Sequence, residues 1–310
     1  MRVRPRIRII YNPTAGKEIV KGKLHYILDV LEESGLEASA FATKGAGDAT
    51  RAAAFAVDEG FDYLVVCGGD GTVNEVVNGL ARKDRRPPLG IIPAGTTNDL
   101  ARALGIPTQI EEAALTVARR FSIQFDLGQI GEDRYFVNIA ACGKLTEITY
   151  DVPSKMKTML GYLAYYMKGL ELLPRLRPIH LHVESDARRF DGKVMLCLIT
   201  NSRHVAGFRD VAPSALVNDG LFDVILVKRT NIGELLRLVS AALRGEHLED
   251  ERVVYFQASE LHLSSKEPVD LNIDGEYGGK LPHSIRIKSS HLSVIVPEEE
   301  LSNGEEDERE

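Results

Sequence analysis

Two hydrophobic patterns divide the chain into an N-terminal and a C-terminal part. In residues 1–120, short apolar runs alternate with segments whose apolar residues recur every three or four positions. This alternation is typical of parallel strands covered by helices. We expect strands at residues 7–11, 63–67 and 89–92 and a helix at 24–33. The first part is therefore predicted to be an α/β domain.

The pattern changes after about residue 125, where β-rich runs follow one another with turns between them. This order favours a β-sandwich. The expected strands are 135–139, 179–183, 194–200 and 222–227, and two helical patterns interrupt them at 155–172 and 232–243. A chain of 310 residues with 44% hydrophobic residues can fill two cores. The predicted domains are residues 1–128 and 129–283.

The net charge of -7 comes entirely from the end of the chain, because residues 298–310 hold eight acids and one arginine. We expect this acidic tail to be disordered, and the remaining 37 basic and 37 acidic residues cancel. The three cysteines show no metal-ligand spacing, and an odd number favours a reducing, cytoplasmic location. No signal peptide is expected at the basic N-terminus, and no apolar run reaches the roughly 20 residues of a membrane span.

Three glycine-containing loops follow the expected strands of the first part: NPTAGK (12–17), GGDGT (68–72) and PAGTTND (93–99). Ligands of open α/β sheets bind beyond the carboxyl ends of the strands, so these loops are expected to converge. Glycines and a helix N-terminus can accept phosphate, and Asp70 would suit a Mg²⁺-bound nucleotide. Two simpler alternatives remain: the glycines serve only tight turns, and Thr72 with Glu75 forms a capping box.

Two acidic turns lie in the second part. Asp274 and Glu276 flank Gly275 in LNIDGEYGGK (271–280), and such a carboxylate could accept the proton of an attacking hydroxyl. The alternative is a plain Asp-Gly turn. The second turn, LVNDGLFDV (216–224), is an ordinary hairpin signal whose oxygen donors are also compatible with a hard cation.

Together the motifs NPTAGK, GGDGTVNEVVNGL, PAGTTNDLAR and LNIDGEYGGKLP resemble the soluble bacterial diacylglycerol kinases, over nearly the whole chain. The resemblance implies a kinase that uses ATP and Mg²⁺ to phosphorylate the hydroxyl of diacylglycerol, giving phosphatidic acid. It also implies a Rossmann-like N-terminal domain, a C-terminal β-sandwich and an active site in the cleft between them. The chain end, at about 284–297, would return to the first domain.

The resemblance also implies roles for individual residues. The proton acceptor would be Glu276, with Asp274 as the residue that orients it, although the sequence does not separate these two roles. Asp70 and Asp126 would organise the catalytic Mg²⁺, with Asp99 nearby, and a structural Mg²⁺ would bind Asp219 and the carbonyls of Leu216 and Leu221. The implied ATP contacts are Asn12, Pro13, Thr14, Ala15, Gly16, Lys17, Thr43, Gly69, Asp70, Gly71, Thr72, Val73, Asn74, Glu75 and Thr96.

One segment of the second part is predicted to contact a membrane. Residues 154–177 interleave lysines and arginines with aromatic residues and methionines, which suits peripheral contact with the inner face of the plasma membrane. The alternative is a core helix with solvated lysines. Rival functions are a kinase for another lipid, a kinase for a soluble acceptor such as NAD, and a nucleotide sensor without catalysis. No nucleic-acid partner is expected, and a homodimer is an open alternative.

Overall fold

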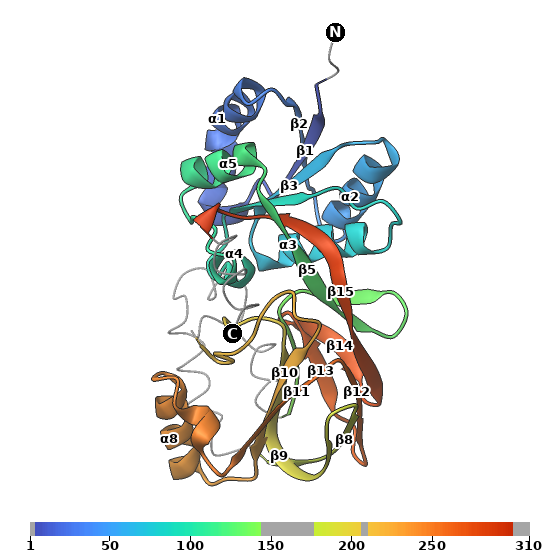
Figure 1. Ribbon diagram of the computed structural model, residues 1–310, viewed down its shortest axis with the longest axis vertical. Helices are drawn as coiled ribbons and strands as arrows, with labels where there is room; N and C mark the ends of the chain where they lie inside the picture. The colour runs from blue at the N-terminus through green and yellow to red at the C-terminus, as the bar shows by residue number, and fades with distance from the viewer. Residues whose placement is uncertain (1–3, 144–176, 206–209, 300–310) are drawn as a thin grey trace. The chain divides into compact units, whose positions relative to one another are not determined.

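The structure, a computed structural model, describes residues 4–143, 177–205 and 210–299 (Figure 1). The predicted helix at 155–172 lies outside the described residues, as does nearly all of the basic and aromatic segment. The chain divides into two units: the first runs to Leu127 and resumes at Ser289, and the second comprises Gly128–Lys288. No helix of the described residues is long and apolar enough to cross a membrane.

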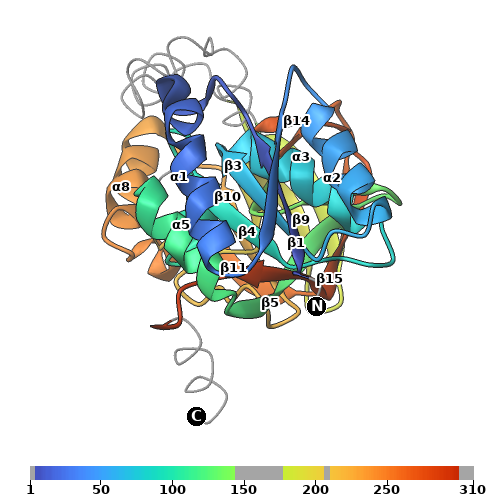
Figure 2. The ribbon, with the colours of Figure 1, turned by 90° about the horizontal axis from the view of Figure 1, so that it is seen from above.

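The first unit contains a parallel sheet with the strand order β15-β4-β3-β1-β2. Every residue of β3 except its first is buried, as expected for a parallel strand covered on both faces. Figure 2 shows α1 and α5 on one side of these strands and α2 and α3 on the other. The elements of this unit are β1 (Arg6–Tyr11), η1 (Ala15–Glu18), α1 (Ile19–Glu33), β2 (Glu37–Ala42), α2 (Asp48–Asp58), β3 (Tyr63–Gly68), α3 (Asp70–Ala81), β4 (Leu89–Pro93), α4 (Asp99–Ala103) and α5 (Ile110–Arg119).

Two strands belong to both units. Strand β5 (Ser122–Ile130) leaves the first unit, and β15 (His283–Ile295) returns to it and pairs with β4 at Val294. The end of β15 and the following residue, Val296, are buried in the first unit.

The second unit is built from antiparallel strands around a core of its own. Strand β9 pairs with three other strands. Its first half, Arg189 to Val194, pairs with β8, and its second half, which ends at Thr200, pairs with β7 and β10. Phe136 and Phe222 stack in this core with ring centroids 5.6 Å apart. The elements are β6 (Arg134–Phe136), β7 (Ile139–Cys142), β8 (Ile179–Ser185), β9 (Arg189–Thr200), β10 (Phe222–Lys228), α8 (Ile232–Ala242), η4 (His247–Glu249), β11 (Val253–Ala258), β12 (Glu260–Ser265), β13 (Asp270–Ile273) and β14 (Glu276–Lys280).

Two local predictions need correction. The single strand expected at 135–139 is two strands, because β6 ends at Phe136 and β7 begins at Ile139. The backbone N–H groups at this break donate to the Asp274 carboxylate rather than to a neighbouring strand. The capping box of Thr72 and Glu75 is also wrong: helix α3 has Gly69 as its N-cap and no side-chain cap hydrogen bond.

Candidate active site

The three glycine-containing loops of the first unit meet at the carboxyl ends of β1, β3 and β4. The N–H of Asn12 donates to the carbonyl of Cys67 at 3.0 Å, and the N–H of Ala94 donates to the carbonyl of Gly68 at 2.8 Å. Thr43 joins the same edge, since its N–H donates to the carbonyl of Tyr11 at 2.9 Å. The backbone therefore brings together the loops predicted to bind ATP, at the position where open α/β sheets bind ligands.

Two glycines allow these loops to lie in contact. A Cβ atom placed on Gly95 would be 2.5 Å from the Cα of Gly69, so neither loop could keep its path with a larger residue. Gly16 has φ of +56°, and a Cβ there would be 2.9 Å from the carbonyl oxygen of Ala94. Glycine is thus required for the close approach of the main chains, beyond any effect on the turns themselves.

Asp70 connects two of the loops. Its Oδ2 accepts the N–H of Asn98 at 2.9 Å, and its Oδ1 accepts the N–H of Asp99 at 2.7 Å. Asn98 has φ of +51°, and its own Oδ1 accepts the N–H of Gly95 at 2.8 Å. The carboxylate at the first turn of α3 therefore fixes the start of α4 and the whole PAGTTND loop.

In the first loop, Asn12 forms an Asx turn. Its Oδ1 accepts both the N–H of Thr14 at 3.0 Å and the Thr14 hydroxyl at 2.8 Å. This local pairing holds the NPTAGK loop in shape just after β1. Among the other residues predicted to contact ATP, Val73 is buried on α3 and Thr96 lies in the loop between β4 and α4.

Glu75 has a contact that its spacing from Thr72 did not predict. Its Oε1 accepts the N–H of Gly47 at 2.9 Å and its Oε2 accepts the N–H of Ala49 at 3.1 Å. Gly47 is the N-cap of α2, so a carboxylate from α3 satisfies the free N–H groups at the start of a neighbouring helix. The Thr50 hydroxyl adds a bond to the Glu75 carbonyl at 2.9 Å.

Replacing Glu75 by alanine is expected to lower the free energy of unfolding by about 1–2 kcal/mol, as the loss of a helix cap does. Urea denaturation measures this change. Glu75→Gln keeps one acceptor oxygen and is expected to lose less. Glu111→Ala, which breaks an exposed ion pair with Lys23, is the control and is expected to have little effect. Unchanged stability together with weaker ATP binding would instead assign the carboxylate to the nucleotide.

Asp126 lies on β5 and is completely buried. Its Oδ1 accepts the N–H of Ser290 at 2.6 Å, and Ser290 has φ of +49° on β15. The described residues contain no group of three or more His, Cys, Asp or Glu side chains arranged to hold a metal ion. A hard cation held by Asp70 and Asp126 would therefore need phosphate or water oxygens as further ligands.

Asp274 and Glu276 form the turn and first strand residue of the β13–β14 hairpin. Asp274 and Gly275 both have positive φ, 47° and 86°, as a type I′ turn requires. The Asp274 carboxylate accepts three backbone N–H groups, from Val137, Asn138 and Ile139, at 2.8 to 3.0 Å. Glu276 begins β14 and is exposed. Asp274 thus fastens the hairpin to the break between β6 and β7 and leaves Glu276 at its edge.

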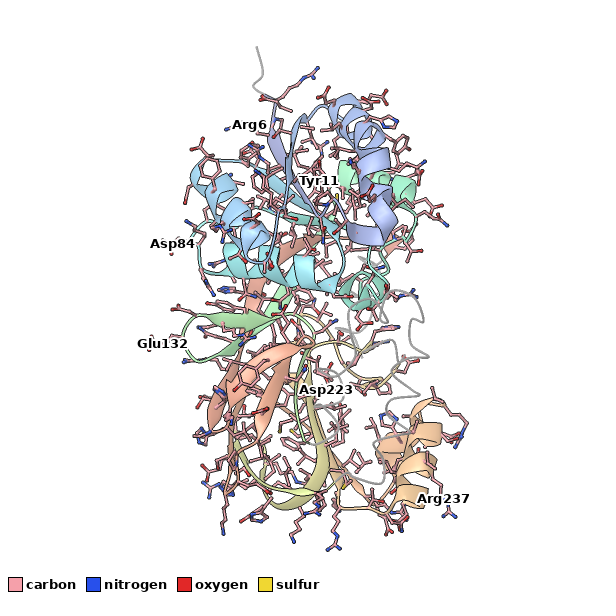
Figure 3. The ribbon with its side chains drawn as sticks, turned by 180° about the vertical axis from the view of Figure 1, so that it is seen from behind. Arg6, Tyr11, Asp84, Glu132, Asp223 and Arg237 are labelled. Atoms are coloured by element: carbon pink, nitrogen blue, oxygen red, sulfur yellow. The ribbon has the colours of Figure 1, made fainter. Side chains whose placement is uncertain are left out.

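The turn at residues 216–221 contains the second predicted cation site. The Oδ1 of Asp219 accepts the N–H of Leu221 at 2.9 Å. Two residues further on, Asp223, which is labelled in Figure 3, is completely buried, and its Oδ1 accepts the Tyr255 hydroxyl at 2.5 Å. Burial raises the pKa of Asp223 to about 6, and its hydrogen bonds with Tyr255 and Gln257 oppose that rise. The predicted ligands, Asp219 and the carbonyls of Leu216 and Leu221, are oxygen donors of the kind that a hard cation takes.

Sequence reasoning missed Asp223, although its signal was present. A charged residue in the middle of the apolar run LFDVIL is unusual in a buried strand, and the Asp223 side chain must therefore have a specific partner. It also missed the long-range contacts of Asp274 and Glu75, which no local pattern encodes.

Comparison with known proteins identifies the family. Residues 6–130 match the diacylglycerol kinase catalytic domain, and residues 147–296 match the YegS C-terminal NAD kinase beta sandwich-like domain. The chain is 50% identical over 295 residues to the diacylglycerol kinase of Bacillus subtilis (strain 168), covering 95% of this chain and 97% of that protein. It is 43% identical over 297 residues to the diacylglycerol kinase of Staphylococcus carnosus (strain TM300), covering 96% and 97%.

Solved structures agree with these relatives. A crystal structure of a diacylglycerol kinase from Bacillus anthracis str. Sterne superimposes with a TM-score of 0.81 at 26% identity, over 96% of this chain and 99% of that one. The predicted fold class, an α/β domain followed by a β-sandwich, is confirmed, and NAD as the acceptor is not favoured. The chain therefore belongs to the diacylglycerol kinase family, whose members are ATP-dependent lipid kinases.

Proposed function

We propose that this chain transfers the γ-phosphoryl group of ATP to the free hydroxyl of a 1,2-diacylglycerol, yielding phosphatidic acid and ADP. The observation that carries the site assignment is the Asp70 carboxylate, which joins the GGDGT and PAGTTND loops at the carboxyl edge of the parallel sheet. The first unit would bind ATP and the second would bind the lipid.

The loops of the first unit supply what phosphate binding requires. The glycines bring backbone within reach of a polyphosphate, and the start of α3 offers free N–H groups with a favourable dipole. The ATP contacts assigned from the resemblance lie on or beside these loops: Asn12 to Lys17, Thr43, Gly69 to Glu75 and Thr96. Mg²⁺ held by Asp70 and Asp126 would offset the negative charge of the phosphates.

The acceptor hydroxyl needs a group that takes its proton. Glu276 is the proposed proton acceptor, because it is an exposed carboxylate on a hairpin whose position is fixed by Asp274. In phosphoryl transfer the protein mainly positions the reactants and offsets charge, so a correctly placed carboxylate suffices. Asp274 would act as a positioning residue through the backbone of residues 137–139.

The test of this function is a panel of acceptors with radiolabelled ATP. Diacylglycerol in mixed micelles and a short-chain diacylglycerol in solution are expected to be phosphorylated, whereas sphingosine and NAD are not. Phosphorylation of NAD with none of diacylglycerol would overturn the proposal. ATP binding without transfer to any acceptor would indicate a nucleotide sensor.

A second Mg²⁺ is proposed at Asp219 and the carbonyls of Leu216 and Leu221, with a stabilising role. Asp219→Ala is expected to lower the melting temperature in Mg²⁺ and to abolish the rise that Mg²⁺ gives the unaltered protein. Differential scanning calorimetry with and without EDTA measures both effects. Asp191→Ala, at an exposed position on β9, is the control. A melting temperature that ignores Mg²⁺ in the unaltered protein would remove this cation from the proposal.

Because diacylglycerol is a bilayer lipid, the enzyme must work at a membrane surface. We propose a cytoplasmic protein that contacts the inner face of the plasma membrane peripherally.

A further inference from the structure

Helix α8 (Ile232–Ala242) of the second unit has one buried side and one apolar side that faces solvent. Leu235 and Leu238 are buried. Leu236, Val239 and Leu243 are 45%, 39% and 66% exposed. Spacings of three and four residues place these three on one face of the helix, because neighbours along a helix surface are three or four positions apart. The helix begins with a capping box that Asn231 and Glu234 form.

The exposed face of α8 is apolar with a basic margin. None of the exposed positions on the helix and in the two residues after it is acidic: they are Gly233, Leu236, Arg237, Val239, Ser240, Leu243 and Arg244. Arg237 lies on the outer side of the helix (Figure 3), and Arg244 contacts Glu246 at 2.8 Å. Glu234, the acidic residue within α8, accepts the N–H of Asn231 in the capping box, and its carboxylate lies 3.4 Å from the Arg252 guanidinium. Arg237 also interacts electrostatically with Glu234 and places its positive charge at the edge of the apolar stripe.

We propose that this face of α8, formed by Leu236, Val239 and Leu243 with Arg237 at its edge, docks on an anionic lipid bilayer. A helix with an apolar face and basic residues beside it lies in the interfacial plane of a membrane, with the apolar side chains below the headgroups and the cations among them. The proposal rests on the proposed function in one respect, since a diacylglycerol substrate requires some contact with a bilayer.

The size of the face favours a bilayer over a second copy of the chain. Eleven residues span roughly 16 Å of helix, so two such helices side by side would bury far less than the about 1,000 Å² that a stable interface needs. A bilayer sets no such minimum, because each apolar side chain that enters the acyl region contributes independently. The arginine margin also matches anionic lipid better than it matches another arginine margin.

The test compares two variants on vesicles of phosphatidylglycerol and phosphatidylcholine containing diacylglycerol. Leu236→Gln with Val239→Gln and Leu243→Gln is expected to weaken co-sedimentation by ~30-fold or more and to raise KM for the vesicle substrate. The control, Phe55→Gln with Leu115→Gln, removes two apolar side chains of similar exposure, 58% and 45%, from α2 and α5 of the first unit. It is expected to bind vesicles like the unaltered protein. Circular dichroism melts check that both variants fold.

The outcomes separate this inference from the proposed function. Phosphorylation of a short-chain diacylglycerol in solution is expected to stay within about twofold in the triple variant, because α8 carries none of the proposed catalytic residues. Vesicle binding by the triple variant equal to that of the control would overturn the inference. A dimer for the unaltered protein and a monomer for the triple variant in gel filtration would also overturn it. Failure of the unaltered protein to phosphorylate soluble diacylglycerol would overturn the function alone.

The preference of the α8 face for anionic lipid is tested separately. The unaltered protein is expected to bind anionic vesicles several-fold more tightly than phosphatidylcholine vesicles, and Arg237→Gln is expected to narrow that difference. Equal binding of both lipids by the unaltered protein would contradict the role of Arg237.

Discussion

Replacing Asp70 by asparagine is expected to lower kcat by about 10³-fold or more, since the charge on the transferring phosphoryl group would lose its compensation. The neutral amide would hold Mg²⁺ poorly. It would also disturb the loops, because asparagine has one acceptor oxygen for the two N–H groups of Asn98 and Asp99, and its NH₂ group would face one of them. Steady-state kinetics over a range of Mg²⁺ concentrations measures the loss.

Asp62→Asn is the matched control for the structural part of this effect. Asp62 precedes β3 at the opposite end of the sheet, and its Oδ2 accepts the N–H of Arg6 at 2.8 Å, the same kind of contact that Asp70 makes. This control is expected to cost some stability and no turnover. Equal losses of turnover in the two variants would reduce Asp70 to a structural residue. Full activity of Asp70→Asn at saturating Mg²⁺ would exclude it from the chemistry.

The first unit followed from the sequence because its signals are local. Strand β3 is a continuous apolar run that ends in glycines, and β4 is a shorter buried run that ends at Pro93 and is followed by Ala94 and Gly95. Strand and loop lie next to each other in the chain, so a parallel sheet with its loops at one edge could be predicted. The division into domains 1–128 with about 284–297, and 129–283, remains a prediction, and the two compact units of the structure divide after Leu127 and after Lys288.

What the sequence did not predict depends on contacts between distant residues. The carboxylates of Glu75, Asp126 and Asp274 each accept backbone N–H groups that lie 28, 164 and 137 residues away. A carboxylate in a loop has the same appearance in the sequence whether it binds a metal, accepts a proton or caps distant backbone. Its partner is fixed only by the tertiary fold.

The predicted start of β9 is wrong, because the strand extends to pair with a second neighbour, β8. The prediction began at Val194, yet β9 begins at Arg189 and continues through Asp191 and Gly192, which look like turn residues. They are extended because Asp191 and Gly192 pair with His182 and Leu181 of β8. Helix α8 was predicted at 232–243 without its cap, although Asn231 with Glu234 three residues later is a capping-box spacing.

The hairpin of β13 and β14 allows the roles of its two acids to be separated. Asp274→Asn is expected to lower the free energy of unfolding by about 1.5–3 kcal/mol, the range for a hydrogen bond to a charged group. Asparagine cannot accept all three N–H groups of residues 137–139, and its NH₂ group would oppose one of them. Any loss of kcat in this variant should accompany the loss of stability.

Glu276→Gln is expected to behave in the opposite way, lowering kcat by roughly 10²- to 10⁴-fold, the usual contribution of a general base, with the melting temperature unchanged. The side chain is exposed at the first position of β14, so its amide form leaves the packing of the hairpin intact. ATP affinity, measured by isothermal titration calorimetry, should stay the same because the change affects only the acceptor hydroxyl. Glu260→Gln, at an exposed position that begins β12, is the matched control and should retain full activity. If Glu276→Gln instead weakened ATP binding in step with kcat, its carboxylate would belong to the nucleotide or metal site. If it kept full turnover, the proton would leave the hydroxyl by another route.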